Sequence, residues 1–296
     1  GMSYSISNVL KEAGIENIIR WVPFEIDKST VVDILRNKMI RPTTIPHMLK
    51  SLLLEQAVAR EALRLGLRHH KTIATRLKGA KAAQRMIGDM LEYSLKETYI
   101  EMMKIDIIAG TGGLLSHAPR RVQPLLILTD AFQPEGITKL YQDSVFMMPH
   151  LGVLSKAIPE IAWNVFDKDC LVRLGTVIAP VGTANQGELV AKVRFEMPDE
   201  TVFERDLKFG EIIKVSLAER MKAKTSISPK HNFDVGAGPG KDLETTIEGG
   251  VVGVVLDARG RPLTLPVDDK ERRSTLMRWF ESLELYPKEF MEGWEK

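Results

Sequence analysis

A short apolar run that ends in a glycine-rich turn constrains the fold of this chain more than any other feature of its sequence. Residues 105–109 have the length and composition of a buried strand, and Gly110-Thr111-Gly112-Gly113 follows them directly. Glycine allows a sharp turn and lets a ligand lie close to the backbone. The junction predicts a strand–turn–helix unit of an α/β protein. The turn itself has two interpretations of equal weight, a ligand site or a tight connection without a ligand.

Helices and short apolar strands alternate around this junction. Leucines at helical spacing after Pro46 predict one long amphipathic helix. Apolar periodicity and run length place the other elements: helices over residues 92–103 and 158–166, a further helix within residues 135–166, and strands over residues 125–130 and 144–147. The long helix is expected to cover residues 46–69. This alternation predicts α/β layers.

The pattern changes after residue 170, where shorter and partly alternating runs are typical of antiparallel strands. These runs cover residues 172–181, 188–196, 200–207 and 211–217. Residues 249–257 and 262–265 flank a glycine-containing loop and predict a hairpin. The final residues return to a helix with Leu276, Trp279, Phe280 and Leu283 on one face. We therefore expect an α/β domain over residues 1–170, a β-rich antiparallel domain over residues 171–266 and a C-terminal helix over residues 267–296.

Composition limits the classes of partner and compartment. The 41 Lys and Arg residues nearly balance the 39 Asp and Glu residues, which gives no reason to expect binding to nucleic acid or to a membrane surface. Apolar runs are too short to cross a bilayer, and the N-terminus has no signal-peptide pattern. Cys170 is the only cysteine, so a cysteine-based metal site is excluded. We expect a cytoplasmic protein with no bound metal, and nothing indicates its oligomeric state.

Several residues are candidates for contacts with a ligand or partner. Arg120 and Arg121 follow the glycine turn and either hold an anion there or lie in a solvated loop. Arg259 and Arg261 lie in the expected hairpin loop, where they clamp a carboxylate or phosphate, are solvated, or contact a partner. The loop at residues 234–241 is not a Walker A motif, because Val235 stands where the motif needs its first glycine and Asp242 stands where it needs Ser or Thr. No set of catalytic residues is legible.

Four segments together resemble a known family. They read NKMIRPTTIP at residues 37–46, EQAVAREALRL at 55–65, GTGGLLSH at 110–117 and GGVVGVVLDARGRPL at 249–263. These segments look like the glutamate mutase MutL-like accessory proteins, which are unrelated to the mismatch-repair protein of similar name. The likeness extends from about residue 21 to residue 266.

The resemblance implies a fold and a role. That family belongs to the superfamily of sugar kinases, Hsp70 and actin, so a ribonuclease-H-like domain fragment of the actin/Hsp70 type is expected ahead of the β-rich domain. Its members are encoded with adenosylcobalamin-dependent mutases and are thought to protect or reactivate them with ATP, which implies a mutase subunit as partner. The family's adenosine motif corresponds to Gly110, Thr111, Gly112 and Gly113.

The sequence departs from this superfamily in one respect. Such ATPases carry two phosphate loops with the pattern Asp-x-Gly, and neither precedes residue 107 here. The resemblance therefore implies a C-terminal portion that holds ATP or ADP with Mg²⁺ only together with a missing N-terminal half. We expect no tightly bound nucleotide and no hydrolysis by this chain alone.

Two alternatives remain open at this point. One is a protein-interaction or scaffold module without nucleotide binding of its own. The other is a small-molecule enzyme that uses Asp130, Asp143 and Arg120, because Asp130 and Asp143 end or adjoin apolar runs where carboxylates often face a cleft.

Overall fold

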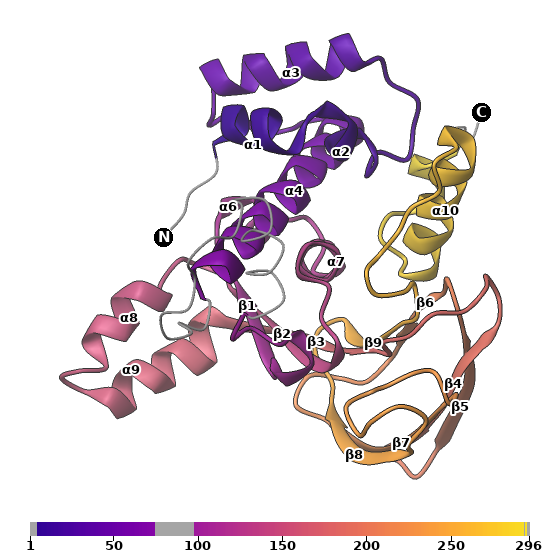
Figure 1. Cartoon of the computed structure of the whole chain (residues 1–296). Coiled ribbons are helices and arrows are strands. Elements are labelled where there is room, and N and C mark those ends of the chain that lie inside the picture. The colour runs from indigo at the N-terminus through magenta and orange to yellow at the C-terminus, as the bar shows by residue number, and fades with distance from the viewer. Residues whose placement is uncertain (1–4, 75–97, 293, 295–296) are drawn as a thin grey trace, which may run out of the picture. The chain divides into compact units, whose positions relative to one another are not determined.

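The computed structural model describes residues 5–74, 98–292 and 294 of the chain (Figure 1). It divides into two compact units. The N-terminal unit comprises Gly1–Val22 and Ile26–Ile105, and the C-terminal unit comprises Pro23–Glu25 and Asp106–Lys296. The α/β region expected over residues 1–170 is thus shared between both units. None of the helices within the described ranges is both long and apolar enough to cross a bilayer.

The N-terminal unit is helical. Its described residues form α1 (Ile6–Ala13), α2 (Ile15–Ile19), α3 (Lys28–Ile40), α4 (Leu49–Ile73) and a 3₁₀ turn at Met102–Lys104. Helix α4 confirms the long helix predicted over residues 46–69, and it buries one apolar stripe that includes Leu53, Ala57 and Leu65. Of the helix predicted over residues 92–103, residues 92–97 fall outside the described residues, residues 98–101 are not helical, and a 3₁₀ turn begins at Met102.

A buried carboxylate joins two helices of this unit. Glu61 on α4 is fully buried and accepts hydrogen bonds from Arg20 Nη2 at 2.7 Å and from Trp21 Nε1 at 2.8 Å. Arg64 pairs with its second oxygen at 2.6 Å. Because a buried charge is tolerated only when it is paired and hydrogen-bonded, this arrangement holds the end of α2 against α4.

A five-stranded mixed sheet forms the centre of the C-terminal unit. Its strands are, in spatial order, β1 (Ile107–Gly110), β2 (Gly136–Asp143), β3 (Leu171–Ala179), β9 (Gly253–Asp257) and β6 (Ile212–Val215). The β1–β2 and β3–β9 pairs are parallel, and the β2–β3 and β6–β9 pairs are antiparallel. The strand predicted at residues 105–109 is therefore confirmed as β1, which ends at the glycine turn.

Helices connect these strands. Between β1 and β2 lie α6 (Gly113–Ser116) and α7 (Val122–Phe132), and between β2 and β3 lie α8 (Met148–Leu154), α9 (Pro159–Val165) and a π-helical turn (Phe166–Cys170). Helix α7 packs against β1, β2 and β3. Helix α9 confirms the helix predicted over residues 158–166.

Two predicted strands are wrong. Residues 125–130 lie in α7, and the strand expected at residues 144–147 is a loop that follows β2. Helix α7 is buried almost all round, from Val122 to Ala131. A helix without a polar face presents the same continuous apolar run as a buried strand, and periodicity cannot separate the two.

A second sheet is wholly antiparallel, as predicted for this part of the chain. Its order is β5 (Val202–Lys208), β4 (Leu189–Glu196), β7 (Lys222–Pro229) and β8 (Leu243–Glu248). Alternate side chains such as Phe195 and Ile227 point into a core that also takes Val254 and Leu256 from β9. The two sheets of this unit thus share one hydrophobic core.

The hairpin predicted at residues 249–265 is wrong. Strand β9 forms, but it lies between β3 and β6, and residues 260–263 form a turn rather than a second strand. The C-terminal helix is confirmed as α10 (Asp269–Ser282), which begins at the N-cap Asp268 and buries the predicted apolar face. Trp279 Nε1 donates to the carbonyl of Gly210 at 2.9 Å and so fixes α10 near β6.

Candidate functional site

The carboxyl ends of two neighbouring parallel strands place two loops side by side. Strands β1 and β2 pair in register with Gly110 opposite Gln142, so the glycine turn after β1 and residues 144–147 after β2 lie at the same edge of the sheet (Figure 1). In open α/β sheets, ligands bind outside the carboxyl ends of the strands. This edge is therefore the candidate ligand-binding site.

The glycines of the turn have two different roles. A Cβ added at Gly110 would lie 2.8 Å from Cδ1 of Leu115 and 3.0 Å from Cδ1 of Leu128, so Gly110 allows α6 and α7 to pack closely on β1. At Gly112 the φ angle is +117°, and no atom of the described residues would lie within 4 Å of such a Cβ. At Gly113 the nearest atom is Cζ of Phe146 at 4.0 Å. Gly112 and Gly113 thus leave open backbone surface.

Asp143, the last residue of β2, organises the neighbouring loop. Its side chain is fully buried and accepts hydrogen bonds from the backbone N–H groups of Val145 at 3.3 Å, Met147 at 3.2 Å and Met148 at 2.9 Å. The hydroxyl of Thr111 lies 3.5 Å from the same carboxylate. Backbone donors compensate the burial of this charge, so Asp143 shapes the loop.

Two hydrogen bonds join the segment after the glycine turn to the end of β2, and a third lies within that segment. Ser116 Oγ donates to the carbonyl of Asp143 at 2.8 Å, and Gln142 Nε2 donates to the carbonyl of Leu115 at 2.9 Å. Arg121 Nη1 donates to the carbonyl of Ser116 at 3.2 Å. The spacing between the glycine turn and the loop after β2 is therefore set by side chains of both.

Two rings lie at the edge of this region. Phe146 has a left-handed backbone with φ of +60° and is 38% exposed. Its ring centroid lies 6.1 Å from that of His117, at an interplanar angle of 59°. An aromatic side chain that remains exposed beside open glycine backbone is a candidate contact for a planar ligand.

The two arginines after the turn lie beside α6. Arg120 is exposed and donates from Nη1 to the carbonyl of Glu284 at 3.1 Å, and Arg121 is half-buried. Each donates to a backbone carbonyl, in contacts that fix the segment between α6 and α7.

Arg259 and Arg261 do not lie in a surface hairpin. Arg259 is 3% exposed and pairs with Asp130 Oδ1 and Asp257 Oδ2, each at 2.8 Å. Arg261 pairs with the same Asp257 oxygen at 2.9 Å, and the Arg259 guanidinium lies 4.8 Å from the ring centre of Trp279. We refer to Asp130, Asp257, Arg259 and Arg261 as the buried ion cluster.

The charges of the buried ion cluster stabilise one another. Burial disfavours the charged form of Asp257, but Arg259 and Arg261 outweigh it and lower the pKa of its carboxyl below the usual range. Burial likewise disfavours the charged guanidinium, while Asp257 and Asp130 raise the pKa of Arg259. The cluster joins α7, the end of β9 and α10 in the interior of the unit.

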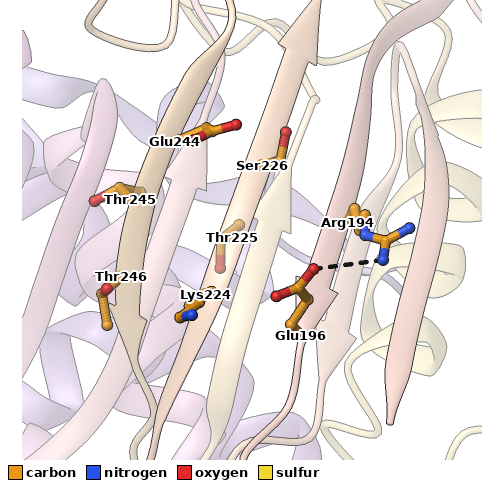
Figure 2. Close-up of a pocket in the computed structure, with 8 residues that line it drawn as sticks. All are labelled: Arg194, Glu196, Lys224, Thr225, Ser226, Glu244, Thr245 and Thr246. Carbon is orange, nitrogen blue, oxygen red and sulfur yellow. Dashed lines mark hydrogen bonds and ion pairs between the residues drawn. The ribbon is translucent and has the colours of Figure 1, made fainter. Parts of the chain in front are cut away.

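A polar pocket of about 370 Å³ lies on the second sheet (Figure 2). Figure 2 shows its lining on three neighbouring strands: Arg194 and Glu196 on β4, Lys224, Thr225 and Ser226 on β7, and Glu244, Thr245 and Thr246 on β8. Two cationic and two anionic side chains face each other here, an arrangement typical of cross-strand pairs on a solvated sheet face. The sequence patterns gave no signal for this pocket.

The remaining glycine-rich loop closes on itself. Asp234 Oδ1 accepts hydrogen bonds from the N–H groups of Gly236 at 2.7 Å and Gly238 at 2.9 Å. Its own aspartate thus takes the backbone donors that a phosphate loop would offer to a ligand. Within the described part of the chain, no three His, Cys, Asp or Glu side chains gather as they would around a metal ion.

Comparison with known proteins identifies the family. No curated protein and no solved structure shows significant similarity to the chain. The model of the family described as MutL protein, however, matches residues 1–170. This range includes the glycine turn, Asp143 and Phe146, and it ends before the pocket of Figure 2 and before Arg259 and Arg261. Since the match covers more than half of the sequence, the chain belongs to the MutL protein family.

Proposed function

We propose that this chain is part of an accessory protein of an adenosylcobalamin-dependent mutase, which it protects or reactivates in a chaperone-like manner. Two findings support the proposal. The chain belongs to the MutL protein family, and its motifs at residues 37–65, 110–117 and 249–263 resemble those of glutamate mutase accessory proteins.

The role proposed for the C-terminal unit is to bind the adenosine part of a nucleotide at the glycine turn. The observation that carries this role is the open backbone at Gly112 and Gly113, at the carboxyl ends of two parallel strands. A purine or ribose can approach such a surface to van der Waals distance, and any Cβ at Gly112 would intrude on it. The turn therefore fits the group that the family resemblance implies.

The phosphates and Mg²⁺ find less support among the described residues. Asp143 contacts the turn through the hydroxyl of Thr111, and its oxygens already accept three backbone N–H groups. The Asp-x-Gly sequence at residues 234–236 closes on itself. Phosphoryl transfer depends on positioning the phosphates and the metal, so this chain alone is proposed to bind ADP weakly and not to hydrolyse ATP.

Titration calorimetry with Mg-ADP and a steady-state ATPase assay test this proposal. Weak binding of ADP, with a dissociation constant in the millimolar range, and no turnover of ATP are expected from the chain alone. Gly112→Val is expected to abolish whatever nucleotide binding the chain has, and Gly152→Ala on α8 is the control because a Cβ there meets open space among the described residues. Robust ATP turnover by the wild-type chain would overturn the proposal.

A second candidate function is a protein-interaction module that binds no nucleotide. The observation that favours it is a group of exposed apolar side chains on or beside α8 and α9: Val153, Ile158, Ile161 and Trp163. Exposed apolar groups of this kind mark surfaces that bind other proteins. If this function is the correct one, Ile161→Glu with Trp163→Glu abolishes mutase co-purification, whereas Gly112→Val leaves nucleotide affinity of the whole protein unchanged.

A further inference from the structure

The loop that follows β2 presents an aromatic ring to the open side of the glycine turn. We infer that a purine base stacks on the ring of Phe146 when adenosine lies against Gly112 and Gly113, and that His117 lies beside the bound base. This inference rests on the adenosine role proposed above and adds to it the residue that recognises the base.

The loop that carries Phe146 is held on both sides by one buried carboxylate. Asp143 anchors Val145, Met147 and Met148 through their backbone N–H groups, on both sides of Phe146. Phe146 itself has a φ of +60°, a conformation that bulky side chains rarely adopt. The buried carboxylate therefore holds the backbone in a conformation that leaves the phenyl ring partly exposed.

The ring of Phe146 lies beside Gly113. Cζ of Phe146 is the nearest atom to the Cβ position of Gly113, at 4.0 Å, while the Cβ position of Gly112 has no atom of the described residues within that distance. The ring thus lies at one side of an open glycine surface. A planar group that covered Gly113 would meet the phenyl ring.

The groups beside the glycine turn favour a neutral ligand. They are a phenyl ring, an imidazole ring 6.1 Å from it and bare glycine backbone. Aromatic side chains stack with nucleobases through their π-faces, and they do so without needing charge or a metal. Two charged side chains of this region already have hydrogen-bond partners. Asp143 accepts from backbone N–H groups, and Arg121 donates to the carbonyl of Ser116. A neutral, planar ring such as a purine is the ligand that these groups recognise.

Adenosine is the probe for the experiment, because the inference concerns only the base and the ribose. Its affinity for the whole chain is measured by ligand-observed NMR up to millimolar concentrations. Phe146→Leu keeps an apolar side chain on the same backbone but removes the π-face, and it is expected to weaken adenosine binding by about tenfold. Phe146→Tyr keeps the ring and is expected to bind as the wild type does. Circular dichroism and thermal unfolding of each variant monitor the fold.

The outcomes separate this inference from the proposed function. If Gly112→Val abolishes adenosine binding and Phe146→Leu leaves it unchanged in a folded protein, the stacking role is wrong and the adenosine role stands. If Gly112→Val leaves adenosine affinity unchanged, or the wild type shows no adenosine binding at all, both are wrong. Ribose serves as the second probe: Phe146→Leu is expected to leave its weak binding unaltered, and an equal loss for ribose and adenosine would also contradict stacking on the base.

Discussion

The glycine turn and the arginines of the buried ion cluster were both candidates for ligand binding from the sequence. In the structure the turn is open, whereas the arginines are buried and paired. At the turn, Gly112 presents bare backbone to open space among the described residues. In the cluster, Arg259 is 3% exposed and its guanidinium is paired with two aspartates. The comparison teaches that a residue's suitability for a ligand is decided by whether the chain itself already supplies the partner.

The largest expected effect comes from removing a charge of the buried ion cluster. Arg259→Met would leave Asp130 and Asp257 buried without their shared cation, and we expect a loss of about 3–5 kcal/mol in the free energy of unfolding. Urea denaturation measures it. Arg120→Met, at an exposed arginine, is the control and is expected to change stability by less than about 0.5 kcal/mol. Equal effects of the two substitutions would contradict the assignment of Arg259 as a structural residue.

Acid should weaken the buried ion cluster in a defined direction. The pKa of Asp257 is lower in the folded chain than its ordinary value of 3.8, so its contribution to stability is present above that value and is lost as the pH falls below it. Arg261→Met removes one of the two arginines that lower this pKa and should make the acid loss shallower. Urea denaturation between pH 6 and pH 3 measures both slopes, and identical slopes would show that Arg261 does not stabilise the carboxylate.

A smaller effect is expected where the buried charge holds backbone instead of another side chain. Asp143→Asn would turn one of the acceptor oxygens into a donor that faces an N–H group, and we expect a loss of about 1–3 kcal/mol. The amide hydrogen of Met148 should then exchange faster with solvent than it does in the wild type. If its exchange rate is unchanged, the carboxylate does not set the conformation of the Phe146 loop.

A methyl group added at the packed Gly110 should lower stability, whereas one added at the open Gly152 should not. Gly110→Ala places a methyl group 2.8 Å from Leu115 and is expected to cost about 1–2 kcal/mol, because the packed side chain must shift. Gly152→Ala adds the same methyl group on α8, where it meets open space, and is expected to stabilise the helix by up to about 1 kcal/mol. Thermal unfolding distinguishes the two signs. Stabilisation by both substitutions would show that Gly110 is not needed for packing.

The smallest effect is expected on the polar face of the second sheet. Arg194 pairs with Glu196 at 3.4 Å (Figure 2) and with Glu204 at 2.7 Å, and all three side chains are about half exposed or more. Arg194→Ala should change the free energy of unfolding by less than about 1 kcal/mol. A larger loss would mean that these pairs support the sheet as strongly as the buried ion cluster supports the interior.

The glycine turn could be found from the sequence because everything that defines it is local. Strand β1, which ends at Gly110, and the three residues after it are adjacent in the chain, and a short apolar run followed by glycines is a sufficient signal. The other half of the site could not be found in this way. Asp143 and Phe146 reach the turn only through the parallel pairing of β1 with β2, and the strand of this region was predicted at residues 125–130 instead of 136–143.

The burial of Arg259 and Arg261 was missed for a related reason. Glycine at position 260 and the apolar runs on both sides are typical of a hairpin, so the arginines were expected at the surface. The available signal was the alternation of Asp257, Arg259 and Arg261, in which an acidic residue precedes two basic ones at even spacing. The second carboxylate, Asp130, comes from α7 and depends on the fold alone. Long-range pairing of charges has no counterpart in local sequence patterns.

The pairing of β2 with β3 has a practical consequence for dissecting this protein. The family match ends at residue 170, and β3 begins at the next residue and pairs with β2 along its whole length, from Gly136 to Asp143. A fragment cut where the match ends would expose the hydrogen-bonding groups of β2 as an unprotected edge, which invites aggregation. The smallest piece of the C-terminal unit worth expressing must therefore carry β3 and its parallel neighbour β9, although both lie beyond the residues that the family model matches.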